Sequence, residues 1–116
     1  MKIHRFADAE IKSVSHDPQL KKRLLVEKSI SCISNLSHIK LVPGQTAVPH
    51  CHEGAYEVFY CISGRVVFGF GEEEAAIGAG DVLVAGPDEE HSIKRVVGDS
   101  ELLYFFAAAP PILARR

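Results

Sequence analysis

The feature that most constrains this chain is the spacing of polar side chains between two glycines, Gly44 and Gly64. Within this stretch His50 and His52 are separated by one residue, and Glu57 follows five positions after the second histidine. A proline directly before the first histidine cannot donate to a helical ladder, and it biases the preceding residue toward extended backbone. Side chains at i and i+2 of an extended segment point to the same side. The two imidazoles can therefore approach one ion.

A strand is predicted directly after a turn at Gly54, because residues 56–62 are rich in aromatic and branched side chains. Glu57 lies near the start of this strand, and it can reach the same ion if the strand pairs beside the segment that carries the two histidines. A third histidine, His91, follows a second glycine-marked turn at Gly80. The sequence predicts that four side chains meet at one metal site: His50, His52, Glu57 and His91.

The order and spacing of these residues resemble the first signature motif of the cupin superfamily, matched at Gly44, His50, His52, Glu57 and Gly64. The resemblance covers about residues 36–108. It implies an all-β fold, a single double-stranded β-helix or jelly-roll barrel, in one domain over residues 1–116. Residues 1–35 would form an N-terminal arm. Such arms often pair with a second subunit in that family, so the resemblance also implies a homodimer.

A second signature motif of the same family is matched in part. It opens at Gly80-Asp81 and places its histidine at position 91. Gly86 and Asp88 stand where the family usually has proline and glycine, and Arg95 replaces the asparagine that often closes the motif. One of the acidic residues before His91, Glu89 or Glu90, could orient a histidine, although exposure is the better interpretation of both.

Short apolar segments separated by glycine and proline support the all-β interpretation. A turn is expected at Pro43-Gly44, and Ser63-Gly64 is expected to close a hairpin. Residues 21–28 fit either a strand or a short helix, and the resemblance favours an early strand. Pro110-Pro111 ends the pattern and leaves a tail, 112–116, outside the barrel or docked on a neighbour. The strands are expected at 30–36, 38–42, 56–62, 65–70, 82–85, 91–97 and 101–107.

Alternation along the strands also predicts a cavity wall. Counting by two from Glu57 places Phe59 and Cys61 on the inner face, and Phe68 and Phe70 share one face of the next segment. These four residues are the candidate substrate-binding positions. Cys61 is better explained as a small buried apolar residue than as a ligand, since the pattern already supplies four donors.

The other histidines have no partner pattern. His4 and His16 are expected to be exposed, and His38 is expected to be structural or on the surface.

The charge and cysteine content of the chain limit the classes of function that it can have. The net charge of −2 and the pI near 6.3 provide no basic surface for nucleic acid. No segment has the length and apolarity of a membrane span, and the first ten residues lack the apolar run of a signal peptide. Three cysteines without a scaffold spacing favour a reducing, cytoplasmic setting.

Three imidazoles and one carboxylate suit a divalent transition metal, and iron, manganese, nickel, copper and zinc are all compatible with this ligand set. We favour a metal-dependent dioxygenase that acts on a small molecule. Two alternatives stay open: a cupin that binds a metal or small molecule without catalysis, and a Lewis-acid isomerase or hydrolase.

Overall fold

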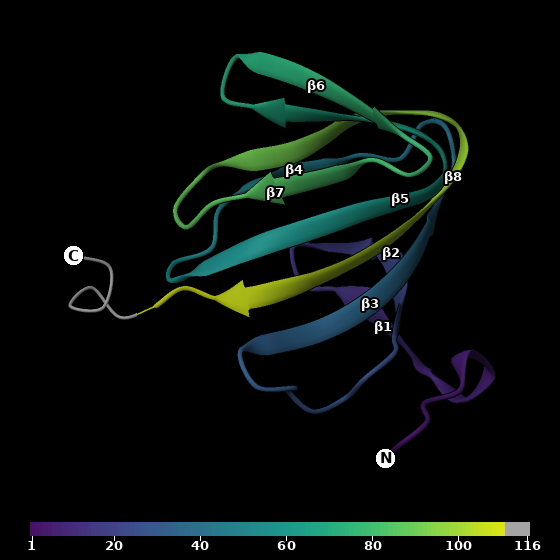
Figure 1. Cartoon of the computed structure of the whole chain (residues 1–116). Helices are drawn as coiled ribbons and strands as arrows, with labels where there is room; N and C mark the ends of the chain where they lie inside the picture. Colours follow the sequence, from purple (N-terminus) through teal and green to yellow (C-terminus); the bar gives the residue numbers. More distant parts are fainter. Residues whose placement is uncertain (111–116) are drawn as a thin grey trace.

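The computed structural model describes residues 1–110, so the predicted tail at 112–116 lies outside the described residues. One short 3-10 helix, η1 (Phe6–Asp8), precedes the strands (Figure 1). The strands are β1 (Glu10–Val14), β2 (Asp17–Leu24), β3 (Ile33–Leu41), β4 (Ala47–His50), β5 (Ala55–Phe70), β6 (Glu73–Gly78), β7 (Val82–Ala85) and β8 (His91–Ala108).

Two long strands, β5 and β8, form the centre of the fold. They pair antiparallel over nearly their full length, from Ala55 opposite Ala108 to Gly69 opposite Ser92. The main sheet order is β1-β2-β3-β8-β5-β6, while β4 pairs with β8 and β7 pairs with β5. Both long strands curve strongly, so their two ends belong to different sides of the molecule (Figure 1). The predicted all-β fold is confirmed.

The hairpin predicted at Ser63-Gly64 is wrong. The chain continues through these residues as the single strand β5, and the pairing with β8 shifts register there. Gly64 adopts a φ of +83°, and a Cβ at this position would lie only 2.6 Å from Ser100 Cα. The glycine therefore permits a bend and a close approach between strands instead of a chain reversal. The reversal comes later, at Gly71-Glu72.

At two other places, segments that were predicted as separate strands form one longer strand. The segments expected at 91–97 and 101–107 are one strand, β8, and those expected at 30–36 and 38–42 merge into β3. The ambiguous region 21–28 supplies the end of β2, which stops at Leu24. The turns predicted at Pro43-Gly44 and Gly54 are confirmed, as is the strand predicted at 82–85.

The core lies inside the curled sheet. Its buried apolar side chains come from β2 through β8, so the N-terminal strands contribute to the same core as the rest. Within residues 1–110, no helix has the length and apolarity needed to cross a membrane. The core members are Leu20, Ile39, Leu41, Ala47, Phe59, Cys61, Val66, Phe68, Ile77, Leu83, Ile93, Val96, Leu102 and Tyr104.

Candidate metal centre

Three strands and one connecting segment bring the predicted ligands together. His50 ends β4 and pairs with His91, the first residue of β8, while His52 lies in the segment that follows β4. Glu57 lies in β5 and points into the group. One potential ligand atom from each residue lies within 4.8 Å of the others. The structure therefore places all four predicted ligands in one cluster.

Glu57 is the central member of this cluster. Its Oε1 lies 2.6 Å from His91 Nε2, 3.3 Å from His52 Nε2 and 3.8 Å from His50 Nε2. Its strand does not pair beside the histidine segment, because β5 is bonded to β6, β7 and β8 while β4 is bonded to β8. Glu57 reaches the histidines because the sheet curls, which brings strands that are not neighbours face to face.

Main-chain carbonyls orient two of the imidazoles. His50 Nδ1 lies 2.8 Å from the carbonyl oxygen of Val48, and His91 Nδ1 lies 3.0 Å from that of Glu89. A carbonyl oxygen only accepts, so each Nδ1 carries the proton and donates it. Each Nε2 then faces the carboxylate of Glu57 as the nitrogen available to a cation.

The environment favours the metal-binding protonation states of Glu57 and His52, while in the metal-free cluster His50 gains affinity for a proton. Burial disfavours the charged form of Glu57, but the nearby imidazoles of His50 and His91 outweigh it and lower its pKa to about 2. Burial lowers the pKa of His52, with opposing influence from Glu57. Contact with the Glu57 carboxylate raises the pKa of His50, and burial reverses only part of this effect. An ionised carboxylate and neutral imidazole are the forms required for coordination.

The donor set fits a transition metal ion. Ligand atoms about 2.1 Å from a common ion and about 90° apart lie about 3.0 Å from each other, and the three nitrogen-to-oxygen distances in the cluster bracket this value. His52 Nε2 is buried and forms no hydrogen bond with any residue in 1–110. A buried nitrogen without a partner is costly, and a bound cation would satisfy it.

An apolar inner cavity of about 50 Å³ lies on one side of the cluster. Phe59 and Phe68 line it, as predicted for the candidate substrate-binding residues. Cys61 is fully buried in the core and does not line it, and Phe70 packs against the core from outside the cavity. The substrate-binding role of these four residues remains a prediction.

A second hollow of about 210 Å³ lies on the other side, and we call it the mouth. It shares Val14, His50, Glu57 and Tyr104 with the inner cavity, so the cluster separates the two spaces. Burial raises the pKa of Tyr104, and the Glu57 charge adds to this effect, so its hydroxyl stays protonated. The remaining residues of the mouth are Ser15, His16, Lys22, Asn35, His52 and Phe106.

Sequence reasoning missed several residues of the mouth, and His16 and Lys22 are the two among them with basic side chains. His16 is exposed as predicted, but its ring stacks on His50 with a centroid distance of 4.6 Å. Lys22 lies on the same face of β2 as Leu20 and Leu24, and this alternation was the available signal. Residues 21–28 fitted both a helix and a strand. Whether their side chains alternate with the period of a strand was therefore undecided before the pairing of β2 with β3 was known.

The loop before His91 departs from the family pattern yet supports the cluster. Asp88 adopts a φ of +62°, a conformation that aspartate tolerates better than most residues. Its main-chain nitrogen donates to the carbonyl oxygen of His52 at 2.9 Å. The Glu89 carboxylate accepts from Gly86 N, so it is the main chain of Glu89 and not its side chain that orients His91.

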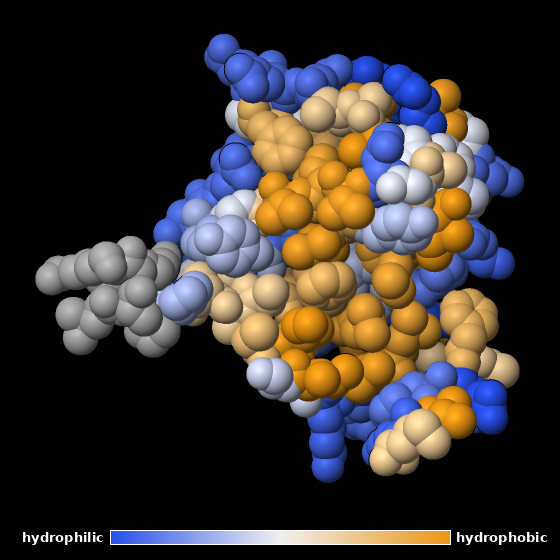
Figure 2. Space-filling model, viewed as in Figure 1, coloured by the Kyte–Doolittle hydropathy of each residue, from blue (hydrophilic) through white to orange (hydrophobic). Residues whose placement is uncertain are grey.

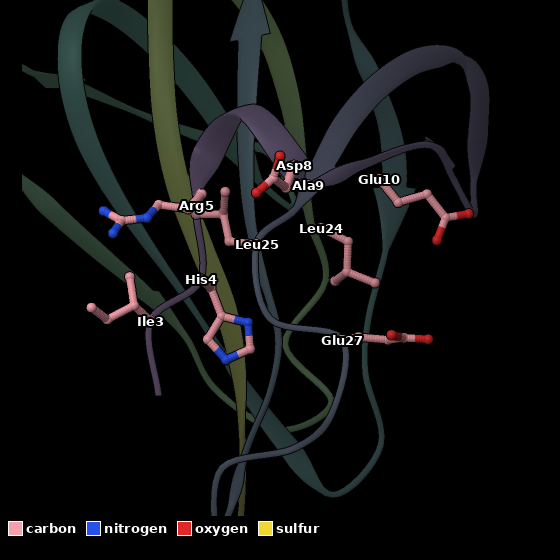
Figure 3. Close-up of a pocket in the computed structure, with 9 residues that line it drawn as sticks. All are labelled: Ile3, His4, Arg5, Asp8, Ala9, Glu10, Leu24, Leu25 and Glu27. Atoms are coloured by element: carbon pink, nitrogen blue, oxygen red, sulfur yellow. The ribbon is translucent and has the colours of Figure 1, made fainter. Parts of the chain in front are cut away.

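A larger hollow of about 380 Å³ lies between the N-terminal segment and the end of β2. Its charged side chains, among them Arg5, Asp8 and Glu27, point in different directions and do not converge (Figure 3). His38, predicted to be structural or on the surface, is buried elsewhere against Phe6 and Glu101. The four-residue cluster is therefore the candidate functional site.

One curated relative matches part of the chain. Over 66 residues the chain is 36% identical to an oxalate-binding protein of Thermotoga maritima. This match covers 57% of the chain and 54% of the relative, so the chain spans about half of that protein's length.

Solved structures share the architecture. A predicted oxalate decarboxylase from Thermotoga maritima superposes with a TM-score of 0.79 at 24% identity, over 92% of this chain and 99% of the other. KdgF from Halomonas sp. gives 0.76 at 17% identity, over 94% and 96%. TT1209 from Thermus thermophilus gives 0.69 at 26% identity, over 95% and 100%.

The family assignment rests on the sequence as well as on the fold. The cupin domain family matches residues 37–107, more than half of the chain. That range holds all four clustered residues and both motifs. The chain belongs to the cupin family, and it carries a three-histidine, one-glutamate cluster compatible with a divalent metal ion.

Proposed function

We propose that His50, His52, Glu57 and His91 bind one divalent transition-metal ion, and that a small molecule reacts at its remaining coordination positions. The observation that carries this proposal is the convergence of three histidine nitrogens on one buried carboxylate. Four protein ligands leave about two positions open in an octahedral shell. A structural zinc site would instead be closed and rich in sulfur.

The inner cavity and the mouth have different roles in this proposal. Phe59, Phe68 and Tyr104 line the inner side and exclude water from it, while the mouth connects the cluster to solvent. Glu57 and the oriented imidazoles of His50 and His91 fix the ion. A redox-active ion would supply electron transfer, and any of the candidate ions would supply Lewis acidity.

Oxygen-dependent oxidation of a small electron-rich molecule is the reaction we propose. The support is the open ligand set of nitrogen and oxygen donors, which suits iron as well as manganese, nickel, copper or zinc. Lewis-acid isomerisation or hydrolysis is the less favoured reaction, although Tyr104, Lys22 and His16 line the mouth beside the cluster. The other two tyrosines, Tyr56 and Tyr60, lie on the outer surface.

Oxygen consumption tests this function. Protein reconstituted with iron(II), and separately with each other candidate metal, is given aromatic diols, diketones and thiols, with and without a carboxylate. We expect a substrate-dependent uptake of oxygen with the iron form and none with the zinc form. Absence of uptake with every redox metal, for protein that retains the metal, would contradict the dioxygenase proposal.

A non-catalytic binding role is the second candidate. The observation that favours it is the similarity to a protein named for oxalate binding. Calorimetric titration of metal-loaded protein with oxalate measures binding. Prolonged incubation then separates a binding protein from an enzyme that consumes oxalate, since a binding protein would leave the oxalate unchanged.

We extend the proposal to the oligomeric state of the protein and to its cellular location. We treat residues 1–116 as one cupin domain. We infer a homodimer from an apolar outer face formed by the exposed Tyr60, Val82 and Val84 and the half-buried Val58, Leu103 and Phe105. These residues lie in adjacent rows on β7, β5 and β8, and apolar side chains gather over these strands (Figure 2). Three free cysteines support a reducing, cytoplasmic setting.

A further inference from the structure

Lys22 is a cationic side chain on the inner face of a strand. In β2, Leu20 and Leu24 are buried in alternate positions, and Lys22 lies between them with the same orientation. Its neighbour Lys21 points outward and donates to Ser13. A lysine among apolar inward-facing residues loses hydration, and this loss lowers its pKa.

The Lys22 ammonium group has no charged partner in the described part of the chain. Among residues 1–110 it forms no ion pair and no hydrogen bond, and its contact with an aromatic ring is the Tyr104 face at 5.8 Å. It lines the mouth together with His50, His52 and Glu57. Glu57 stabilises its charge from a distance, but that carboxylate is directed at the histidines.

The charges around the mouth are unbalanced once a metal is bound. A divalent ion, three neutral imidazoles and the Glu57 carboxylate leave one net positive charge, and Lys22 adds a second. Both charges face the same half-enclosed space, where water screens them less than at an open surface. An anion that spans the ion and the ammonium group would neutralise both.

Polar groups at the rim add to the recognition of such an anion. Asn35 lines the mouth with a φ of +55°, at the irregular pairing between β3 and β8. An irregularity of this kind re-aims a side chain. His16 lies over His50 at the same rim. An amide and an imidazole can each donate a hydrogen bond to a carboxylate oxygen.

We propose that Lys22 recognises a carboxylate of the substrate or ligand at the mouth, and so makes this site selective for small carboxylic acids, dianions above all. The inference rests on the proposed metal site and does not depend on which reaction occurs there. It places a specificity-determining residue in the N-terminal arm, outside both family motifs.

The test measures ligand binding to protein loaded with cobalt(II), whose visible spectrum reports changes at the metal. Acetate, oxalate and malonate are compared with uncharged acetamide by calorimetry and by the cobalt spectrum. The variants are Lys22→Met, Lys22→Arg and the outward-facing control Lys21→Met. Unfolding curves and metal content verify that each variant retains its fold and its ion.

We expect carboxylates to bind the wild-type protein and Lys21→Met alike, with acetamide bound at least about tenfold more weakly. Lys22→Met should lose about tenfold or more in carboxylate affinity, the magnitude of a lost charged hydrogen bond, and Lys22→Arg should recover part of it. Equal carboxylate affinity in Lys22→Met and wild type, with metal retained, would overturn the role of Lys22, as would the binding of no carboxylate by the metal-loaded wild type. A wild-type protein that takes up no metal would refute the proposed metal site instead.

Discussion

His50 and His91 show how single residues prepare the cluster for a cation. In each, a main-chain carbonyl accepts a hydrogen bond from Nδ1–H and leaves Nε2 directed at Glu57. His52 has no such support, and its Nε2 is buried without a hydrogen bond among residues 1–110. The three histidines therefore differ in what holds them, although all three face the same carboxylate oxygen.

Substitution of His52 tests whether the cluster binds metal. We expect His52→Ala to weaken metal binding by at least about tenfold, since removal even of groups that only orient metal ligands costs about 10–100-fold. Elemental analysis and competition with a chelating dye measure the effect. His4→Ala is the control, because His4 is exposed and lies away from the cluster. Equal metal affinity in His52→Ala and wild type would remove His52 from the site.

The Glu57 carboxylate makes the metal-free protein sensitive to acid. Its folded-state pKa of about 2 lies below the ordinary value of 4.5. A depressed pKa contributes stability that is complete above the ordinary value and is lost as the pH falls toward the folded-state value. We expect the free energy of unfolding of metal-free wild type to fall more steeply between pH 4.5 and 2 than that of Glu57→Gln.

Urea unfolding at a series of pH values measures this difference. Glu57→Gln should fold and should bind metal more weakly than wild type. A constant difference in stability between the two proteins across this pH range would show that the Glu57 charge contributes nothing to folding.

At the scale of elements, the bend of β5 at Gly64 decides how the sheet curls. Both Gly64 and Gly44 have a positive φ, +83° and +96°, but their surroundings differ. A Cβ on Gly64 would lie 2.2 Å from Ser100 Oγ and 2.5 Å from the Asp99 carbonyl oxygen, whereas a Cβ on Gly44 would meet no atom within 4 Å. Alanine substitutions at these two glycines therefore separate the free-energy cost of backbone strain from that of a steric clash.

We expect Gly44→Ala to lower the free energy of unfolding by about 1–2 kcal/mol, from left-handed strain alone. Gly64→Ala should cost a further 1–3 kcal/mol or so, because the methyl group forces β5 and β8 apart. Urea unfolding of both variants gives the comparison. Equal destabilisation would mean that β8 yields at Ser100 without cost.

At the scale of the whole molecule, the outer face of β7, β5 and β8 remains exposed in a single chain (Figure 2). Val84 is 53% exposed there, beside Val58 in the adjacent strand. We expect Val84→Lys to shift the protein from dimer to monomer in sedimentation experiments, because a charge cannot be buried without a partner. Metal content should not change, since the substitution faces away from the cluster.

Val97→Lys is the matched control, because Val97 is 50% exposed and pairs with Arg65 instead of an apolar row. It should leave the dimer intact. A wild-type protein that sediments as a monomer would refute the proposed assembly.

The sequence by itself determined the ligand types, their spacing and the extended character of the chain. Proline before His50, the turns at Gly44 and Gly54, and the alternation after Glu57 are local properties, and local sterics and side-chain period are sufficient to predict them. The cupin motif connected these properties to a single barrel. The four residues of the cluster were therefore identifiable before any coordinates.

Only the tertiary structure decided which strands face each other. Gly64 could mark a hairpin or a bend, and the close approach of β8 selected the bend. Glu57 meets the histidines across a curled sheet and not from a neighbouring strand. Lys22 reaches the mouth because β2 pairs with β3, and His16 lies in the turn between β1 and β2. Strand partners are chosen by burial over the whole chain, so local alternation can give the face of a strand but not the strand that it meets.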